Sequence, residues 1–299
     1  MENYRFDSNQ ITRDYFDSLL IEMRHIDSEI PDTSVELFGH RFSTPITTAA
    51  LSHLNNTAPE GMKKMALGAK MADALCFSGM GEEQELRDMC DTGAKVIKIV
   101  KPHADNATVY AKIREAEEAG AIAVGMDIDH AFNGNGDYDI VVGLPMRPKS
   151  LEEMKAFVAS TKLPFIVKGV LSVQDAEKCL EMGAAGIIVS HHHGIMNNAI
   201  PPLLVLPDIK EAVGDKMTIL VDCCVESGMD VFKALALGAD AVCVGRAIMG
   251  PLKENGAEGV RDKMMAMNNE LKAVMERTAF KTINEIDDSV IWDNPCFMR

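Results

Sequence analysis

The chain has 299 residues, 47% hydrophobic and 25% charged, which is the composition of a folded protein with a large apolar core. Its net charge of -15 argues against a nucleic-acid backbone or an anionic membrane as partner, because both would repel it. Seven cysteines without a CxxC spacing argue against a disulfide framework or a zinc ribbon. Residues 1–16 lack the apolar core of a signal peptide, and no long apolar span occurs, so we expect a cytoplasmic protein.

One pattern repeats along the chain: a short apolar run, a loop, and an amphipathic segment that ends at glycine. Helix-like segments such as 106–120 and 150–161 separate the runs. Continuous apolar strands that alternate with helices indicate a parallel sheet covered by helices, and eight such units predict a closed (β/α)₈ TIM barrel. We expect a helical cap over the first 40 residues and a closing helix over 254–279. The eight runs span residues 45–51, 74–79, 95–100, 121–129, 164–170, 186–193, 218–225 and 241–249.

A doubly wound open sheet is the alternative architecture. It usually carries a GxGxxG loop after its first strand, whereas PITTAALSHL (45–54) contains no glycine. No Pro-, Ser- or Gly-rich linker divides the chain. The sequence therefore predicts a single domain over residues 1–299.

In a barrel, polar residues at the carboxyl ends of the strands face the active-site mouth. Any one such residue is equally explained as a solvated strand end, but a serine, acids, bases and histidines at one rim predict a catalytic site. The residues at these positions are Ser78, Lys98, Asp127, Lys168, His191, His192, His193, Asp222 and Arg246.

Three motifs in the second half carry a family resemblance: LPFIVKGVLSVQDA (163–176), GAAGIIVSHHHG (183–194) and the segment 220–252 with DVFKALALGA and VGR. They resemble the FMN-dependent 2-hydroxy acid oxidases and dehydrogenases, the group of glycolate oxidase and lactate oxidase. GHRFSTPITTAAL (39–51) and AEEAGAIAVGMD (116–127) extend the resemblance more loosely. It implies a TIM barrel with FMN across the strand ends, a small-molecule substrate and a homo-oligomer, often a tetramer.

The resemblance also implies cofactor contacts. Lys168 matches the lysine beside flavin N1 and O2, where a cation stabilises the charge of reduced flavin. Gly245 and Arg246 match the phosphate site after the eighth strand, and Asp222 matches the acid that contacts the ribityl chain. The remaining implied cofactor-binding positions are Ala49, Ala50, Ser78, Lys98 and Cys224.

The family pattern S-N-H-G-x-R assigns the catalytic histidine to His192, which takes a proton as a hydride equivalent leaves carbon for the flavin. Imidazole suits this role because its pKa lies near working pH, and a carboxylate can fix its tautomer. Asp127, which matches the acid of the family's T-V-D, is the candidate carboxylate. His193 and Asn197 are candidates for substrate contacts.

Three consecutive histidines also raise the possibility of a metal site. In an extended strand His191 and His193 would share one side and His192 the other, so the three could not readily chelate one ion. No H-x-E or HExxH pattern accompanies them. We therefore expect no metal at this motif.

The chain departs from the family pattern in the S-N-H-G-x-R motif and in the phosphate loop. Ile195 stands where the family has the arginine that clamps the substrate carboxylate. Cys223 and Cys224 replace two glycines of the phosphate loop, and Glu226 replaces an arginine. The expected function is oxidation of a 2-hydroxy acid or related alcohol, with two alternatives: an FMN-dependent isomerase, or a flavin-free barrel that binds a phosphorylated ligand.

Overall fold

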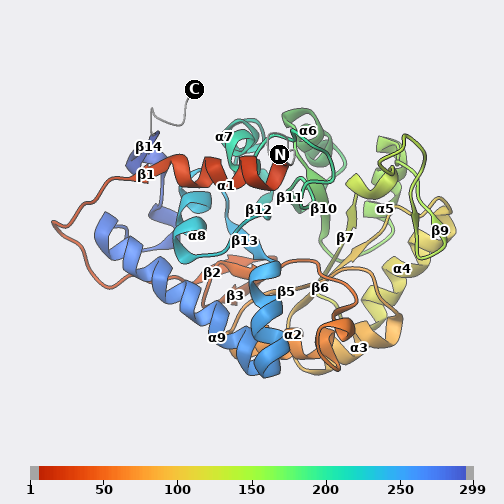
Figure 1. Ribbon diagram of the computed structural model, residues 1–299. Coiled ribbons are helices and arrows are strands. Elements are labelled where there is room, and N and C mark those ends of the chain that lie inside the picture. The colour runs from red at the N-terminus through yellow and green to blue at the C-terminus, as the bar shows by residue number, and fades with distance from the viewer. Residues whose placement is uncertain (1–6, 294–299) are drawn as a thin grey trace, which may run out of the picture.

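The computed structural model describes residues 7–293 and contains the predicted (β/α)₈ barrel (Figure 1). Eight parallel strands form one sheet, and Thr48 N donates to Leu75 O at 3.2 Å, which joins its two ends. In spatial order the strands are β4 (Ile46–Thr48), β13 (Ala241–Val244), β12 (Thr218–Val221), β11 (Gly186–Val189), β10 (Phe165–Val170), β7 (Ala123–Asp127), β6 (Val96–Val100) and β5 (Cys76–Ser78).

A helix follows each strand and covers the outside of the barrel (Figure 1). Two of them begin at capping boxes, Ser150–Glu153 and Ser227–Asp230, where side chains satisfy free backbone N–H groups of the first turn. The closing helix begins at Arg246 rather than at residue 254, with a break at Gly256 (φ 61°). The helices are α2 (Gly61–Met71), α3 (Glu83–Asp91), α4 (Asn106–Glu118), α5 (Leu151–Ala159), α6 (Val173–Glu181), α7 (Pro202–Val213), α8 (Gly228–Ala236) and α9 (Arg246–Thr278).

The apolar core has two layers. One lies between the sheet and the helices, and the other fills the inside of the barrel with side chains such as Phe77, Ile166 and Leu220. The hairpin of β2 (Val35–Leu37) and β3 (His40–Phe42) joins the inner layer and packs at Gly186, the first residue of β11. The amino ends of the strands are thereby closed, which leaves the carboxyl ends for a ligand.

Over residues 7–45, which precede the barrel strands, the chain is helical only in α1 (Ser8–Ser18), so the expected helical cap is a single helix. After α1, β1 (Leu19–Ile21) pairs with β14 (Ile291–Asp293) near the other end of the chain. A second small hairpin, β8 (Ile140–Val141) and β9 (Leu144–Pro145), lies between β7 and α5. Over residues 7–293 none of the helices combines the length and the apolar character needed to cross a membrane.

Candidate active site

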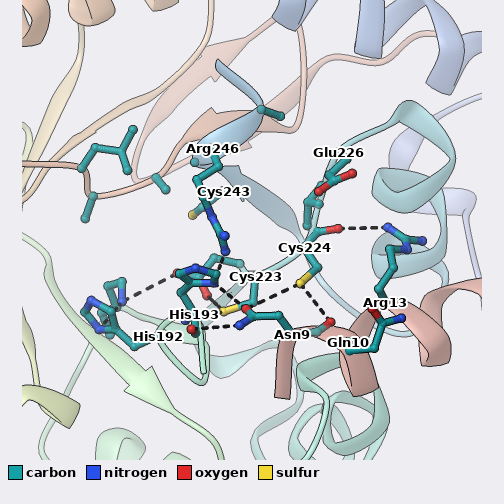
Figure 2. A pocket seen from close by; sticks show the side chains of 18 of the residues that line it. Asn9, Gln10, Arg13, His192, His193, Cys223, Cys224, Glu226, Cys243 and Arg246 are labelled. Atoms are coloured by element: carbon teal, nitrogen blue, oxygen red, sulfur yellow. Dashed lines mark hydrogen bonds and ion pairs between the residues drawn. The ribbon is translucent and has the colours of Figure 1, made fainter. Parts of the chain in front are cut away.

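A cavity of about 560 Å³ opens at the carboxyl ends of the barrel strands (Figure 2). Its volume is in the range of small-molecule and cofactor sites. The walls come from α1 and from the residues that follow β4, β11, β12 and β13. The lining residues are Asp7, Asn9, Gln10, Arg13, Ala49, Ala50, Leu51, Lys168, His192, His193, Asp222, Cys223, Cys224, Val225, Glu226, Cys243, Gly245, Arg246 and Ala247.

Most residues expected at the site from the sequence line this cavity. Four do not. Ser78 and Lys98 are buried at the ends of their strands, and the Lys98 ammonium donates to the carbonyl of Gly79. Asp127 is buried and contacts His192 from outside the cavity wall, while Asn197 is exposed on the loop after β11. Those that line the cavity are Ala49, Ala50, Lys168, His192, His193, Asp222, Cys224, Gly245 and Arg246.

Lys168 is a buried cation at the centre of the site. Its Nζ lies 3.8 Å from Asp127 Oδ1 and 3.7 Å from Asp222 Oδ2, and the side chain is 5% exposed. Burial alone would disfavour the charged form, but Asp127 and Asp222 outweigh it and raise the pKa of Lys168. The lysine is therefore a fixed positive charge at any ordinary pH.

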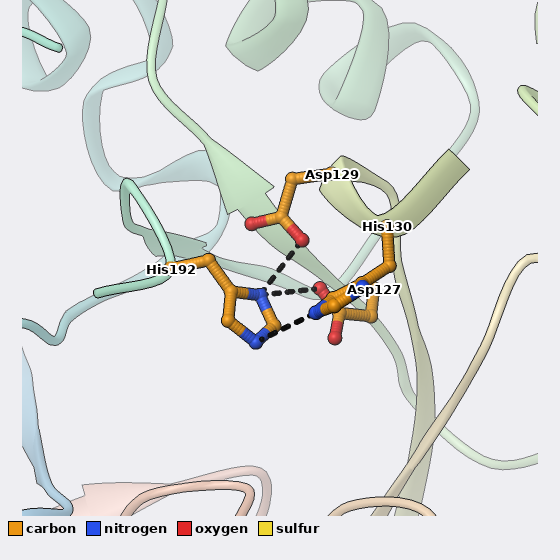
Figure 3. Close-up of side chains that lie close together, drawn as sticks. All are labelled: Asp127, Asp129, His130 and His192. Carbon is orange, nitrogen blue, oxygen red and sulfur yellow. Dashed lines mark hydrogen bonds and ion pairs between the residues drawn. The ribbon is translucent and has the colours of Figure 1, made fainter. Parts of the chain in front are cut away.

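His192 lies between two carboxylates (Figure 3). Its Nδ1 is 2.8 Å from Asp129 Oδ1 and 3.4 Å from Asp127 Oδ1. Burial disfavours the imidazolium, yet the hydrogen bonds to Asp127 and Asp129 prevail and raise the pKa of His192 to about 9. The predicted base and its predicted carboxylate are thus brought together, and a second carboxylate is added.

Sequence reasoning missed Asp129 and His130, which form the start of the 3₁₀ turn η3 (Asp129–Ala131) after β7. His130 Nε2 lies 3.1 Å from His192 Nε2, and His130 Nδ1 lies 3.2 Å from Asp139 Oδ2. The two rings meet edge to face with centroids 4.3 Å apart. The available signal was DIDH (127–130), a cluster of ionisable residues directly at a strand end.

The three consecutive histidines have three different environments. His191 is buried, with Nε2 2.8 Å from Thr12 Oγ1 and Nδ1 accepting from Gly194 N at 2.9 Å, so it ties α1 to the barrel. His193 contacts Asn9 and Arg246 on the cavity wall. The expectation of an extended strand here is wrong: β11 ends at Val189, and His192 and His193 have φ values of 48° and 58°.

In the loop after β12, two cysteines adopt the left-handed backbone conformation that glycine most readily adopts. Cys223 and Cys224 have φ values of 71° and 58°, a left-handed conformation that is costly for residues with a Cβ and that is enriched at active sites. The Cys223 thiol donates to Asp222 Oδ1 at 2.9 Å, and burial followed by the charge of Asp222 raises its pKa. Glu226 adds a carboxylate to the same wall of the cavity.

The barrel, its closed amino end and the charged cavity at its carboxyl end define a cofactor-dependent barrel enzyme. A sequence model of the family "FMN-dependent dehydrogenase" matches residues 6–156 and 147–293. The chain belongs to this family. It is an FMN-dependent enzyme of the α-hydroxy acid oxidase and dehydrogenase type.

Individual relatives align over about half to nearly all of the chain. Glycolate oxidase 3 of Arabidopsis thaliana is 27% identical over 97% of this chain and 89% of its own length. A 2-hydroxyacid oxidase of Dictyostelium discoideum is 39% identical, over 49% of this chain and 38% of its own length. Among solved structures, a mandelate oxidase variant with a monooxide FMN adduct superposes with a TM-score of 0.88 at 27% identity, covering 96% of this chain and 92% of that one.

The residues of the cavity fit FMN. The buried ammonium of Lys168 suits the flavin ring system, and Ala49 to Leu51 provide a small apolar wall beside it. Arg246 stands at the first position of α9, where free backbone N–H groups and a guanidinium suit a phosphate. Glu226 opposes a phosphate at this end, so Arg246 and the helix N-terminus have to outweigh its charge.

Proposed function

We propose that the protein oxidises the hydroxyl-bearing carbon of a small molecule, a 2-hydroxy acid or a related alcohol, with His192 as the base. FMN, when bound, supplies the hydride acceptor. The proposal is carried by one observation: an imidazole held by two carboxylates lies at the cavity wall, 3.1 Å from the buried ammonium of Lys168.

Each group at this site has a separate task in the proposed reaction. His192 accepts the hydroxyl proton as the hydrogen on carbon departs with its electron pair. Asp127 and Asp129 orient the imidazole through Nδ1 and stabilise the imidazolium that forms. Lys168 supplies a positive charge that is fixed before the reaction begins, which favours the accumulation of negative charge beside it.

The substrate lacks the anchor that an arginine at position 195 would provide. Lys101, a possible replacement, donates from Nζ to Asp127 Oδ2 at 2.6 Å, so its charge is already paired. His103, another, is 5% exposed and does not line the cavity. His193 remains a polar group on the wall. We therefore propose that the substrate is a larger or differently anchored alcohol than lactate or glycolate.

The proposal also covers the cellular location and the oligomeric state of the protein. The six cysteines of residues 7–293 are all free thiols, which is consistent with the cytoplasmic location that we propose for this protein. We also propose a homo-oligomer, on the strength of the resemblance described above.

Anaerobic mixing of the FMN-loaded protein with a panel of hydroxy acids and neutral alcohols tests the reaction. A substrate that bleaches the flavin absorbance and yields the carbonyl product in equal amount supports the proposal. A compound that turns over without net bleaching would point instead to isomerisation. A purified protein that neither contains flavin nor takes it up would contradict the proposal.

A further inference from the structure

Four side chains beside the cavity converge on one point from two separate segments (Figure 3). Asp127, Asp129 and His130 come from the end of β7 and η3, and His192 comes from the loop after β11. Each offers one nitrogen or oxygen atom, and the four atoms lie within 4.8 Å of one another. The proposed reaction uses His192 and the carboxylates but gives no role to His130.

The contact between the two imidazoles requires an explanation. His192 Nδ1 faces Asp129 and His130 Nδ1 faces Asp139, at 2.8 Å and 3.2 Å. When both Nδ1–H groups donate to these carboxylates, both Nε2 atoms carry lone pairs, and these lie 3.1 Å apart. Two lone pairs at this distance repel each other unless a proton or a cation lies between them. A carboxylate behind each imidazole is also how proteins orient histidines that bind metals.

The spacing suits two ligands of one transition-metal ion. Histidine nitrogens bind Zn²⁺ at about 2.0–2.1 Å, and ligand angles of about 90–110° then separate them by roughly 2.9–3.4 Å. The observed 3.1 Å between His130 Nε2 and His192 Nε2 is within this range.

Two carboxylates belong to the same cluster and lie on the Nδ1 side of His192. Asp127 Oδ2 accepts from Lys101, and Asp129 Oδ1 faces His192. Asp129 Oδ2 is buried without a hydrogen-bond partner, and the buried Asp127 Oδ1 has only the longer contacts with His192 Nδ1 at 3.4 Å and Lys168 Nζ at 3.8 Å. Buried carboxylate oxygens without a donor are costly, which makes a cation a favourable partner.

The local charge also leaves room for a dication. Asp127, Asp129, Asp139 and Asp222 are set against Lys101 and Lys168, which leaves one negative charge in excess when His192 is protonated and two when both imidazoles are neutral. Lys168 lies 3.1 Å from His192 Nδ1, the ring nitrogen that faces away from His130. The repulsion between the Lys168 ammonium and a cation at Nε2 is therefore reduced, because Lys168 lies on the Nδ1 side of the ring.

We propose that a divalent transition-metal ion of the Zn²⁺ type binds between the Nε2 atoms of His130 and His192, within this cluster of carboxylates, and blocks His192 as a base. This differs from the expectation drawn from the three consecutive histidines, only one of which takes part. The second histidine comes from another strand end. The inhibitory effect rests on the proposed function, whereas metal binding does not.

Equilibrium dialysis of the FMN-loaded protein against micromolar Zn²⁺, with the metal measured by mass spectrometry and the flavin by absorbance, tests the site. We expect one Zn²⁺ per wild-type chain, and binding at least 10-fold weaker in His130→Ala. Asp139→Asn should weaken binding by about 10- to 100-fold, as is usual for a partner of a metal-binding histidine. His25→Ala, a change at an exposed histidine outside the cluster, should bind as the wild type does.

Thiols are the main competing ligands, because Cys223 and Cys224 lie on the same cavity. The double variant Cys223→Ser, Cys224→Ser should retain the ion. Loss of Zn²⁺ from this variant with retention in His130→Ala would overturn the site. So would equal binding by the wild type and a His130→Ala protein that keeps its flavin and its melting temperature, or no binding by the wild type.

The rate of flavin reduction tests whether the metal blocks the base, separately from whether the metal binds. Zn²⁺ should slow reduction by substrate in the wild type, a chelator should restore it, and the rate of His130→Ala should not respond to the metal. Stoichiometric Zn²⁺ bound through His130 without any slowing would refute the block of the base. If no alcohol reduces the flavin at all, the proposed function fails, while the dialysis result still decides the metal site.

Discussion

Asp129 Oδ1 lies 2.8 Å from His192 Nδ1 and is the nearer of two carboxylates on one imidazole, with Asp127 at 3.4 Å. The pair is made by residues 63 positions apart in the chain. Burial, followed by the charge of Asp127, raises the pKa of Asp129 to about 6, despite the hydrogen bond with His192. At neutral pH both carboxylates are still mainly ionised, so they stabilise the imidazolium and make His192 a more basic group than a free histidine.

The first prediction concerns the pH dependence of flavin reduction. His192 has to be neutral to accept a proton, and its pKa is raised to about 9, so the reduction rate at saturating substrate should rise with pH up to about 9. Asp129→Asn removes one of the hydrogen bonds that raise this pKa and should move the midpoint to lower pH. Stopped-flow measurements from pH 6 to 10 give the midpoint. Asp137→Asn, at an exposed position nearby, is the control and should leave it unchanged.

The same proton links stability to pH. Because the pKa of His192 is higher in the folded state than the value of about 6.5 for a free histidine, its contribution to stability is fully present below pH 6.5. It is lost as the pH rises through about 9. The melting temperature of the wild type should therefore fall more between pH 6.5 and pH 9.5 than that of His192→Asn. Parallel curves for the two proteins would contradict the raised pKa.

Replacement of the base should slow the chemistry and spare the cofactor. General-base catalysis contributes a factor of about 10²–10⁴, so His192→Asn should slow flavin reduction by that order with an unchanged flavin spectrum. His191→Asn should have a much smaller effect on the rate per bound flavin, because His191 faces Thr12 and not the cavity. Equal losses of rate in both variants would mean that the base has been misassigned.

Replacement of Lys168 should slow flavin reduction, whereas replacement of Arg246 should weaken FMN binding. Lys168→Met should still bind FMN but be reduced slowly, and it should melt at lower temperature because Asp127 and Asp222 lose their shared cation. Arg246→Met loses hydrogen bonds to the phosphate worth about 1.5–3 kcal/mol each, so its flavin should dissociate on dilution. Flavin content after gel filtration and the reduction rate per bound flavin distinguish the two. Wild-type values of both quantities in both variants would show that the cofactor lies elsewhere.

Small 2-hydroxy acids should be poor substrates. Ile195 offers no charge-assisted hydrogen bond to a carboxylate, and the loss of one or two such bonds weakens transition-state binding by about 10- to 10⁴-fold. Anaerobic stopped-flow with lactate, glycolate and mandelate measures this directly. Rapid, saturable bleaching by any of them below millimolar concentration would show that another group has replaced the arginine.

The sequence by itself determined the barrel and the end at which its chemistry lies. Strands covered on both faces have to be continuously apolar, so eight apolar runs separated by amphipathic segments were visible without tertiary information. The rule that ligands bind at the carboxyl ends of barrel strands then placed Lys168, His192 and Arg246 on one cavity, as observed. The strand β1 in the N-terminal segment was not predictable from local sequence, because it forms by pairing with β14 near the other end of the chain.

Only the tertiary structure decided which histidines act together. His191, His192 and His193 are neighbours in the chain, yet left-handed backbone at two of them turns the three side chains toward different partners. His130 is 62 positions from His192 and lies beside it because β7 and β11 both flank β10. Local spacing constrains such contacts weakly, since they depend on how two loops fold after their strands have ended. The polar cluster of Asp127, Asp129, His130 and His192 is therefore a property of the folded barrel.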